Sequence, residues 1–262
     1  MENTMKSTLL KSALPFAVIA LASAFSATAE NIEQQMDVPM GGTLDLRTDA
    51  GSIEIRTHNQ PYAVIEVDVR GRDQEDFEVV TQMRGDTLEV IGEVESNNWN
   101  RSLQVKFEIT VPEDFNIEVD TAGGSISIDD LEGNIDARTS GGSIQVGEVH
   151  GEVELHTSGG SIKTEAIYGP LNAHTSGGSI RATFAEQLTE DASLETSGGS
   201  ITAYLIKDIQ VDINASTGGG SVRTDFDIDG RVKKQSIKGE INGGGPELDL
   251  HTSGGSVNIR SL

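Results

Sequence analysis

The hexapeptide Thr157-Ser-Gly-Gly-Ser-Ile162 decides the fold, because near-identical copies of it recur through the second half of the sequence. The serine before the final Ile or Val falls at positions 125, 143, 161, 179, 200, 221 and 256, in steps of 18, 18, 18, 21, 21 and 35 residues. A weaker copy, Thr48-Asp-Ala-Gly-Ser-Ile53, lies upstream. Repetition at a fixed period indicates stacked structural units. The last step is near two periods, so we expect one degenerate unit between Asp225 and Gly245.

A second turn lies half a period from each hexapeptide, with the pattern apolar-x-Gly-x-apolar, as in Leu131-Glu-Gly-Asn-Ile135. Between the turns the residues alternate. Ile135, Ala137 and Thr139 fall on one face of a strand, and the polar residues between them fall on the other. This period of two indicates strands with one buried face. Each unit therefore reads as strand, turn, strand, turn.

Two all-β architectures fit this pattern. In a parallel β-solenoid, which is β-helix-like, coils of about 18 residues and two strands stack so that equivalent residues form ladders about 4.8 Å apart. In an antiparallel meander, every turn would be a hairpin. We favour the solenoid, because constant spacing with identical turn chemistry is what stacked coils require. A β-rich N-terminal cap would cover one end of the stack, where unpaired edges invite aggregation.

Glycine pairs mark the turns of the expected solenoid. We expect positive φ angles there, since glycine reverses the chain without a Cβ clash. The residues assigned to these structural turns are Gly123, Gly124, Gly141, Gly142, Gly159, Gly160, Gly177, Gly178, Gly198, Gly199, Gly254 and Gly255.

The chain divides into three segments. Residues 1–29 are typical of a signal peptide, with two lysines, an apolar run and a small-residue cleavage site ending at Ala29. Residues 30–118 are expected to form the β-rich capping region, with Trp99 in a polar loop that it anchors. Residues 119–262 carry the glycine-rich repeats. The sequence thus predicts an exported protein, either periplasmic or associated with the cell surface and outer membrane.

Composition restricts the partners. The chain has 42 acidic and 19 basic residues, a net charge of −23, which disfavours nucleic acid and anionic lipid surfaces. It has no cysteine, and no second apolar run long enough to span a membrane follows the signal peptide. The expected partner is an envelope protein or a glycan.

Enzyme and cofactor motifs are missing from the sequence. It contains no G-x-S-x-G, H-E-x-x-H or P-loop pattern, so we assign no catalytic residue. Serine, rather than aspartate, follows the glycine pairs, whereas calcium-binding β-rolls need carboxylates there. We therefore expect no cofactor.

Two outward ladders hold the candidate binding residues. His156 and His174 are 18 residues apart and would be neighbours, as a weak candidate metal site or as an exposed polar ladder. On the other sheet, the ladder would run Gln145, Lys163, Arg181, Thr202, Arg223. Its cations, Lys163, Arg181 and Arg223, would either bind an anionic group or keep the surface soluble.

Longer motifs resemble a known family. They are Gly42-Thr-Leu-Asp-Leu-Arg-Thr-Asp-Ala-Gly-Ser-Ile-Glu-Ile55, the step from Val111-Pro112 into Thr121-Ala-Gly-Gly-Ser-Ile126, and Ile241-Asn-Gly-Gly-Gly-Pro-Glu-Leu248. The chain is similar to exported bacterial β-strand-repeat proteins that form a domain of unknown function and usually carry the label adhesin. The resemblance implies a β-solenoid-like fold and an envelope setting. It implies no catalytic residues.

These observations favour a non-enzymatic β-repeat protein of the cell envelope or surface, with a structural or adhesin-like interaction role. Two alternatives stay open at this point. One is a carbohydrate-active β-helix enzyme, which needs carboxylates gathered in a groove. The other is a periplasmic scaffold or sensor in envelope-stress signalling.

Overall fold

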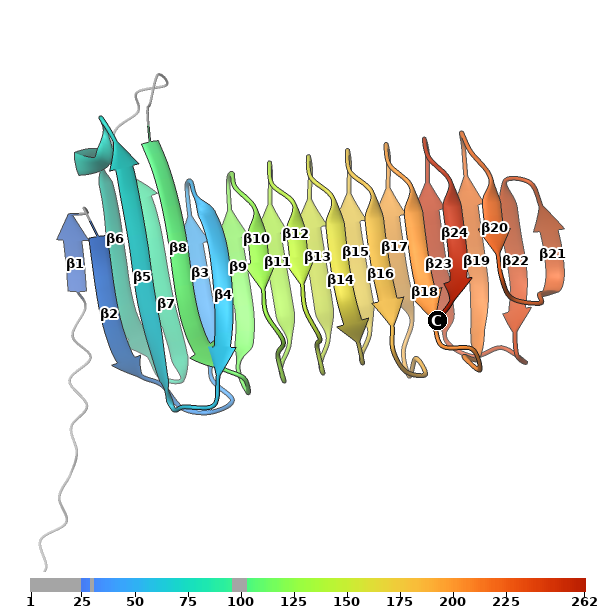
Figure 1. The fold of residues 1–262 in the computed structure, drawn as a ribbon, viewed down its shortest axis with the longest axis horizontal. Helices are drawn as coiled ribbons and strands as arrows, with labels where there is room; N and C mark the ends of the chain where they lie inside the picture. The colour runs from blue at the N-terminus through green and yellow to red at the C-terminus, as the bar shows by residue number, and fades with distance from the viewer. Residues whose placement is uncertain (1–24, 29–30, 96–102) are drawn as a thin grey trace, which may run out of the picture.

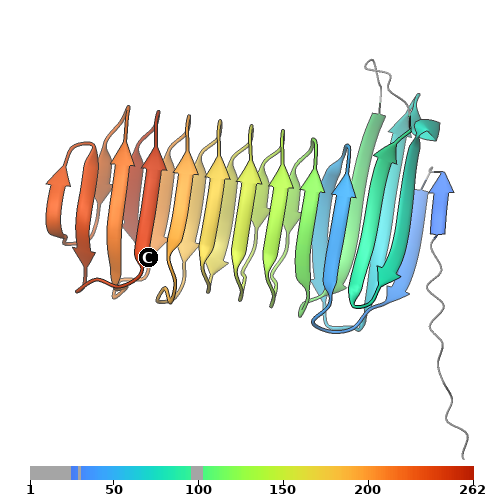
Figure 2. The same cartoon turned by 180° about the vertical axis from the view of Figure 1, so that it is seen from behind.

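The computed structural model describes residues 25–28, 31–95 and 103–262, and they form one elongated stack of β-strands (Figures 1 and 2). Most of the expected signal peptide and the loop with Trp99 lie outside the described residues. Two sheets face one another along the full length of the stack, as a comparison of the two views shows. No helix among the described residues is long and apolar enough to cross a membrane.

Sheet A contains 13 strands in the described residues, and sheet B contains 11. In spatial order, sheet A consists of β1 (Phe25–Thr28), β6 (Phe77–Arg84), β7 (Thr87–Val94), β3 (Thr43–Thr48), β9 (Asn116–Thr121), β11 (Ile135–Thr139), β13 (Val153–Thr157), β15 (Leu171–Thr175), β17 (Ala192–Thr196), β23 (Glu247–Thr252), β19 (Val211–Thr217), β22 (Ser236–Ile241) and β21 (Asp229–Lys233).

The strands of sheet B are given in the same spatial order, from the N-terminal end of the stack. It consists of β2 (Asn31–Asp37), β5 (Tyr62–Gly71), β8 (Leu103–Pro112), β4 (Ser52–His58), β10 (Ile126–Ile128), β12 (Ile144–Val146), β14 (Ile162–Ile167), β16 (Ile180–Phe184), β18 (Ile201–Leu205), β24 (Val257–Ser261) and β20 (Val222–Thr224). One 3-10 turn, η1 (Gln74–Asp76), precedes β6.

The repeats form a parallel β-solenoid, which confirms the predicted fold class. Strand β11 pairs in parallel with β13, and each residue lies opposite its own copy 18 positions on, as Arg138 does with His156. The same register joins β12 to β14, and Gln145 lies opposite Lys163. Each coil thus adds one strand to each sheet.

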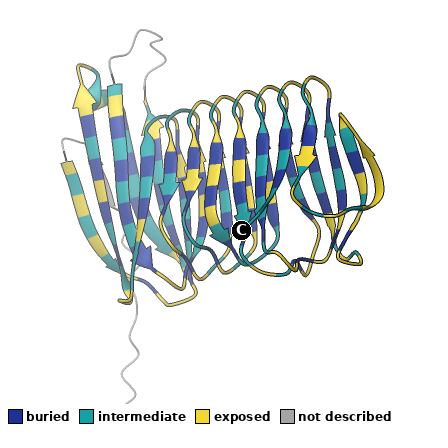
Figure 3. Ribbon diagram, turned by 45° about the vertical axis from the view of Figure 1, so that its right-hand side comes forward, coloured by how far each residue is buried: buried dark blue, intermediate teal, exposed yellow. Residues whose placement is uncertain are grey.

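The core is the space between the two sheets. Alternate residues of each strand are buried there, and the residues between them reach the outer faces (Figure 3). The cores of the repeats are mostly aliphatic, as at Ile144 and Leu155, with Phe184 as an exception, while the N-terminal region adds Phe77 and Phe107. Figure 3 shows this banding on every coil, which is why the period of two could be read from the sequence.

The two sheets continue into the N-terminal region without a break. Strands β3 and β4 pair in parallel with β9 and β10, so the weak copy around Gly51 turns the first coil of the stack. Beyond this coil, β5 pairs antiparallel with β2 and β8, and β6 pairs antiparallel with β7. The antiparallel strands cover the end of the parallel stack.

The structure at the C-terminal end of the stack differs from what the repeat spacing predicted. No degenerate coil fills residues 225–245. They include the hairpin β21–β22, and β22 pairs antiparallel with β19. The last repeat, β23 and β24, lies between coil β17–β18 and coil β19–β20. The second step of 21 residues and the step of 35 residues therefore span a change in stacking order, which spacing alone does not reveal.

The threonine of each hexapeptide joins adjacent coils. The Thr157 hydroxyl donates to the carbonyl of Gly142 on the preceding coil at 2.7 Å, and it lies 3.3 Å from the N–H of Gly160. The side chain is buried, so these two bonds satisfy its hydroxyl and two partly buried backbone groups. Equivalent bonds at Thr196, Thr252 and Thr217 confirm the spatial order of the last three coils.

The expected positive φ is wrong for most of the repeat glycines. Among the assigned turn residues, only Gly124 lies in the left-handed region, at φ +116°. These turns need glycine because adjacent coils approach each other too closely for a Cβ atom. A Cβ on Gly160 would lie 2.1 Å from the carbonyl oxygen of Gly142, whereas one on Gly159 would lie 3.2 Å from that of Gly141. The second glycine of the pair lets the coils stack.

Candidate functional site

The outward face of sheet B carries a ladder whose charge changes along the stack. From the first coil onward its rungs are Glu54, Ser127, Gln145, Lys163, Arg181, Thr202, Asn258 and Arg223. None of the rungs from Ser127 to Arg223 is acidic. We call the part from Lys163 to Arg223 the cationic ladder. Parallel pairing spaces its rungs by about 4.8 Å.

Arg181 is the central cation of this ladder. It is exposed on β16, directly between Lys163 and Thr202, and it has no ion pair within the described part of the chain. Lys163 is 3.6 Å from Glu165, and both side chains are about half exposed. An exposed pair of this kind contributes little and leaves Lys163 available to a ligand. Two adjacent cations therefore face solvent in the middle of the sheet.

The cationic ladder differs from the predicted one at Asn258. Because the last repeat lies between two earlier coils, Asn258 separates Thr202 from Arg223. Sequence spacing had placed Arg223 next to Thr202. Lys163 and Arg181 are adjacent, as expected, but Arg223 is three rungs from Arg181, roughly 14 Å away.

A second column runs beside the cationic ladder on the same face. Tyr204 pairs with Thr183 and Arg260, and it is half-buried. Arg260 Nη1 lies 2.7 Å from Asp225 Oδ1. Tyr204 thus adds an aromatic ring and a hydroxyl next to the ladder. Sequence analysis missed both Tyr204 and Asn258. Tyr204 could have been found in the sequence as an outward residue of a strand. The place of Asn258 between Thr202 and Arg223 could not, because the spacing of the repeats does not show the insertion of the last one.

The N-terminal part of sheet B is acidic, and two of its carboxylates are paired with cations. Glu54 and Glu108 face each other across β4 and β8, and Lys106 Nζ lies 2.9 Å from the first and 2.7 Å from the second. Arg56 bridges the same two carboxylates. Hydrogen bonds from Lys106 and then Arg56 hold the pKa of Glu54 below its ordinary value.

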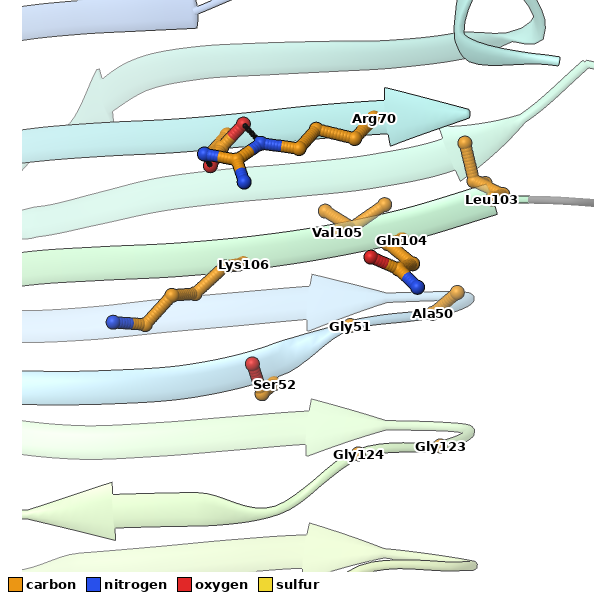
Figure 4. Close-up of a pocket in the computed structure, with 11 residues that line it drawn as sticks. Ala50, Gly51, Ser52, Arg70, Leu103, Gln104, Val105, Lys106, Gly123 and Gly124 are labelled. Carbon is orange, nitrogen blue, oxygen red and sulfur yellow. Dashed lines mark hydrogen bonds and ion pairs between the residues drawn. The ribbon is translucent and has the colours of Figure 1, made fainter. Parts of the chain in front are cut away.

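A groove of about 630 Å³ opens beside this network, between the glycine turns of the first coils and β8 (Figure 4). Gly51 and Gly124 line it together with Arg70, Gln104 and Lys106. Arg70 is bonded to Asp68 at 2.6 Å, and Lys106 is held as described. Both cations of the groove are thus already paired, unlike Arg181.

The outward face of sheet A carries the two candidate histidines. His156 and His174 lie opposite each other, and their rings are stacked with centroids 5.0 Å apart and planes 5° apart. His174 Nδ1 is 3.6 Å from Glu195 Oε2, and Glu195 in turn faces His251. Parallel stacking separates the ring nitrogens instead of directing them to one point. Within the described residues, no three His, Cys, Asp or Glu side chains are grouped to hold a metal ion.

Sheet A is also the more acidic face. Asp136, Glu154 and Asp249 project from the column beside the histidines, and Arg138 bridges the first two. Burial, together with the negative charges of Glu195 and Glu247, raises the pKa of Asp249. The two faces of the solenoid therefore differ in charge, and Arg181 lies on the less acidic face.

A family model described as Toastrack DUF4097 matches residues 116–260, which include every coil of the regular repeat. The chain belongs to this Toastrack family. Membership confirms the predicted resemblance to a β-repeat family of unknown function, and the Toastrack fold is β-solenoid-like. A search of the curated proteins found no match.

Solved structures similar to this Toastrack chain include three bacterial proteins. A candidate cell adhesion protein of Clostridium sporogenes has 15% identity and a TM-score of 0.35, and the match covers 88% of this chain and 100% of that one. A candidate adhesin of Bacteroides fragilis has 14% identity and a TM-score of 0.30, with 88% and 97% covered. A candidate lipid-binding protein of Parabacteroides distasonis has 16% identity and a TM-score of 0.42, with 88% and 96% covered. At these TM-scores none of them carries an argument about function.

Proposed function

We propose that this Toastrack chain is a non-enzymatic interaction protein of the cell envelope that binds an acidic glycan along the outward face of sheet B. The observation that carries the proposal is the cationic ladder. Lys163 and Arg181 are adjacent, solvent-exposed and directed to one side, on a chain whose net charge is −23.

The chemistry of the ladder suits an extended polyanion. Arg181 presents a guanidinium that can bind a carboxylate or sulfate with two parallel hydrogen bonds, and Lys163 adds a point charge one rung away. Thr202 and Asn258 follow as neutral hydrogen-bonding rungs before Arg223. Tyr204 lies alongside, and an aromatic face packs against a sugar ring. The ladder therefore offers two adjacent cations, two neutral rungs and a third cation to a glycan that carries both acidic and neutral sugars.

The envelope setting rests on the N-terminal sequence. Residues 1–29 have the charge, apolar length and cleavage site of a signal peptide, so we assign the protein to the periplasm or the cell surface. Protease shaving of intact cells distinguishes these two places. Loss of the protein on shaving would indicate the surface, and protection until the outer membrane is opened would indicate the periplasm.

The binding test uses the processed protein and two polyanions, polygalacturonic acid and dextran sulfate, with neutral dextran as the reference. We expect binding to both polyanions, weakened by salt because the contacts are exposed ion pairs. Replacing both Lys163 and Arg181 by glutamine should weaken binding about tenfold or more, since each charge-assisted hydrogen bond contributes about 1.5–3 kcal/mol.

The matched control is the double change Lys233→Gln and Lys234→Gln, which removes the same charge from the exposed hairpin at the end of the stack. Equal weakening by both double variants would mean that net charge alone controls binding, and it would overturn the proposal. Binding to anionic vesicles but not to polysaccharide would reassign the ladder to lipid. Release of reducing sugar during incubation would show an enzyme instead.

A further inference from the structure

The outer edge of β6 is occupied by a strand from the expected signal peptide. Strand β1, Phe25–Thr28, pairs antiparallel with β6, and Phe25 lies opposite Thr81 and Thr28 opposite Glu78. Figure 1 shows β1 at the N-terminal end of the stack, outside every other strand. If export cleaves the chain after Ala29, as the proposed function requires, β1 is removed and the outer edge of β6 loses its hydrogen-bonding partner.

The other three sheet edges are protected by charge or shortness. Strand β21 is exposed along its whole length and carries Arg231 and Lys233. Strand β20 has three residues with Arg223 at its centre. In strand β2 every second residue is exposed, and these exposed residues include Glu33 and Asp37. Charged and short edge strands are how proteins prevent pairing between edges.

Strand β6 lacks this protection. Its eight residues are Phe-Glu-Val-Val-Thr-Gln-Met-Arg, and the central run from Val79 to Met83 has no charge, proline or glycine. Nearby, the apolar side chains of Ile32, Met36 and Met83 are only partly buried against the core. Cleavage therefore exposes an edge that is both long and uncharged at its centre. The structure shows that this edge accepts an antiparallel strand.

From this geometry we infer that the mature protein forms a two-fold symmetric dimer in which β6 pairs antiparallel with β6 of a second copy. Pairing centred on Val80 places Val79 opposite Thr81 and Phe77 opposite Met83. These four side chains face the core side of sheet A, so the pairing keeps every residue on its own face. Glu78 lies opposite Gln82, and no like charges meet.

A second copy is the occupant that this edge fits best. A two-fold contact uses the same strand on both sides, so both exposed edges are satisfied at once. It also extends sheet A and its apolar lining across the contact, which adds burial for Met83. The end of the stack that the signal peptide covers before cleavage thus becomes the dimer interface afterwards.

The test is the mass in solution of the protein purified after export with its own leader, with its N-terminus read by mass spectrometry. We expect an N-terminus at Glu30 and twice the monomer mass by light scattering. The variant Val80→Lys puts two lysines opposite each other at the two-fold axis, so its mass should fall by half. The control Val232→Lys, on the protected edge β21, should stay dimeric.

Rescue separates an interface effect from a folding defect. Mixing Val80→Lys with Val80→Glu protein should restore the dimer as a heterodimer, because opposite charges then face each other. A monomeric wild type, a dimer that survives Val80→Lys, a failed rescue or a retained leader would each overturn the inference. Polyanion binding by sheet B does not involve Val80, so its loss or retention reports on the proposed function separately.

Discussion

The hydroxyl of Thr157 donates to the carbonyl oxygen of Gly142, one coil away, at 2.7 Å. The Thr157 side chain is fully buried, and the two glycines that it contacts are partly buried. The same hydroxyl lies 3.3 Å from the N–H of Gly160 in its own turn. One side chain therefore holds its own turn in shape and fixes the turn of the preceding coil beside it.

The change Thr157→Val should destabilise the protein by about 1–3 kcal/mol, although valine has nearly the same shape. It leaves the partly buried Gly142 carbonyl and Gly160 N–H without their side-chain partner. Urea unfolding followed by circular dichroism measures the loss. The neighbouring change Ser158→Ala, at an exposed position, should stay within about 0.5 kcal/mol of wild type. Equal effects at the two sites would contradict the role of the hydroxyl.

The two glycines of one turn should respond differently to alanine. A Cβ on Gly160 would lie 2.1 Å from the Gly142 carbonyl oxygen, so Gly160→Ala must push two coils apart. We expect a loss of about 3 kcal/mol or more, in the range of severe overpacking. Gly159→Ala meets its nearest atom at 3.2 Å on an exposed turn and should cost less than about 1 kcal/mol. Thermal unfolding of the two variants makes the comparison, and similar losses would exclude the close-approach explanation.

Stability should depend on pH in opposite senses at two carboxylates. The pKa of Asp249 is raised in the folded state by burial, then by Glu195 and Glu247, so its charge opposes folding above that pKa. Asp249→Asn should therefore stabilise the protein at neutral pH, and the gain should vanish as the wild-type carboxyl protonates in acid. Urea midpoints measured across this range test the sign.

Glu54 gives the contrasting case. Its folded pKa is lowered by Lys106 and then Arg56, so its contribution is present above its ordinary pKa of 4.5 and is lost as pH falls through the lowered value. Glu54→Gln should destabilise the protein at neutral pH. The effect should be modest, because the ion pairs of Glu54 are partly exposed. If both substitutions moved the urea midpoint in the same direction, the assigned pKa directions would be wrong.

The position of the last repeat can be tested by disulfide formation, since the chain has no native cysteine. Thr202 and Asn258 lie opposite each other on adjacent parallel strands, which places their Cα atoms about 4.8 Å apart, within reach of a disulfide. Thr202 and Arg223 are two rungs apart, about 9.6 Å, and beyond that reach. We expect the pair Thr202→Cys with Asn258→Cys to oxidise and the pair Thr202→Cys with Arg223→Cys to stay reduced. The reverse outcome would restore stacking in sequence order.

The sequence predicted the solenoid because its two strongest signals report on backbone geometry. The 18-residue spacing gave the register of Arg138 with His156, and the alternation around Ala137 gave the buried face. Both depend only on neighbours in the chain and on coils that repeat. The adjacency of Lys163 and Arg181 followed from the same spacing.

The sequence did not predict what depends on contacts outside the period. The close approach of Gly160 to Gly142 was mistaken for a φ requirement, because both demand glycine and only the structure distinguishes them. The pairing of Asn258 with Thr202 was missed, because the chain returns to a gap between two earlier coils. Residues 225–245 lack the repeat pattern because a hairpin, and not a coil, occupies that stretch.

The insertion of β23 and β24 between earlier coils makes the end of the chain an internal part of the stack. Synthesis proceeds from the N-terminus, so β23 and β24 are made after both of the coils that they join. A product that stops before Glu247 lacks an interior strand of each sheet, β23 in sheet A and β24 in sheet B. The distal coils can therefore be joined only after β23 and β24 have been made, and a shorter product keeps open strand edges that favour proteolysis.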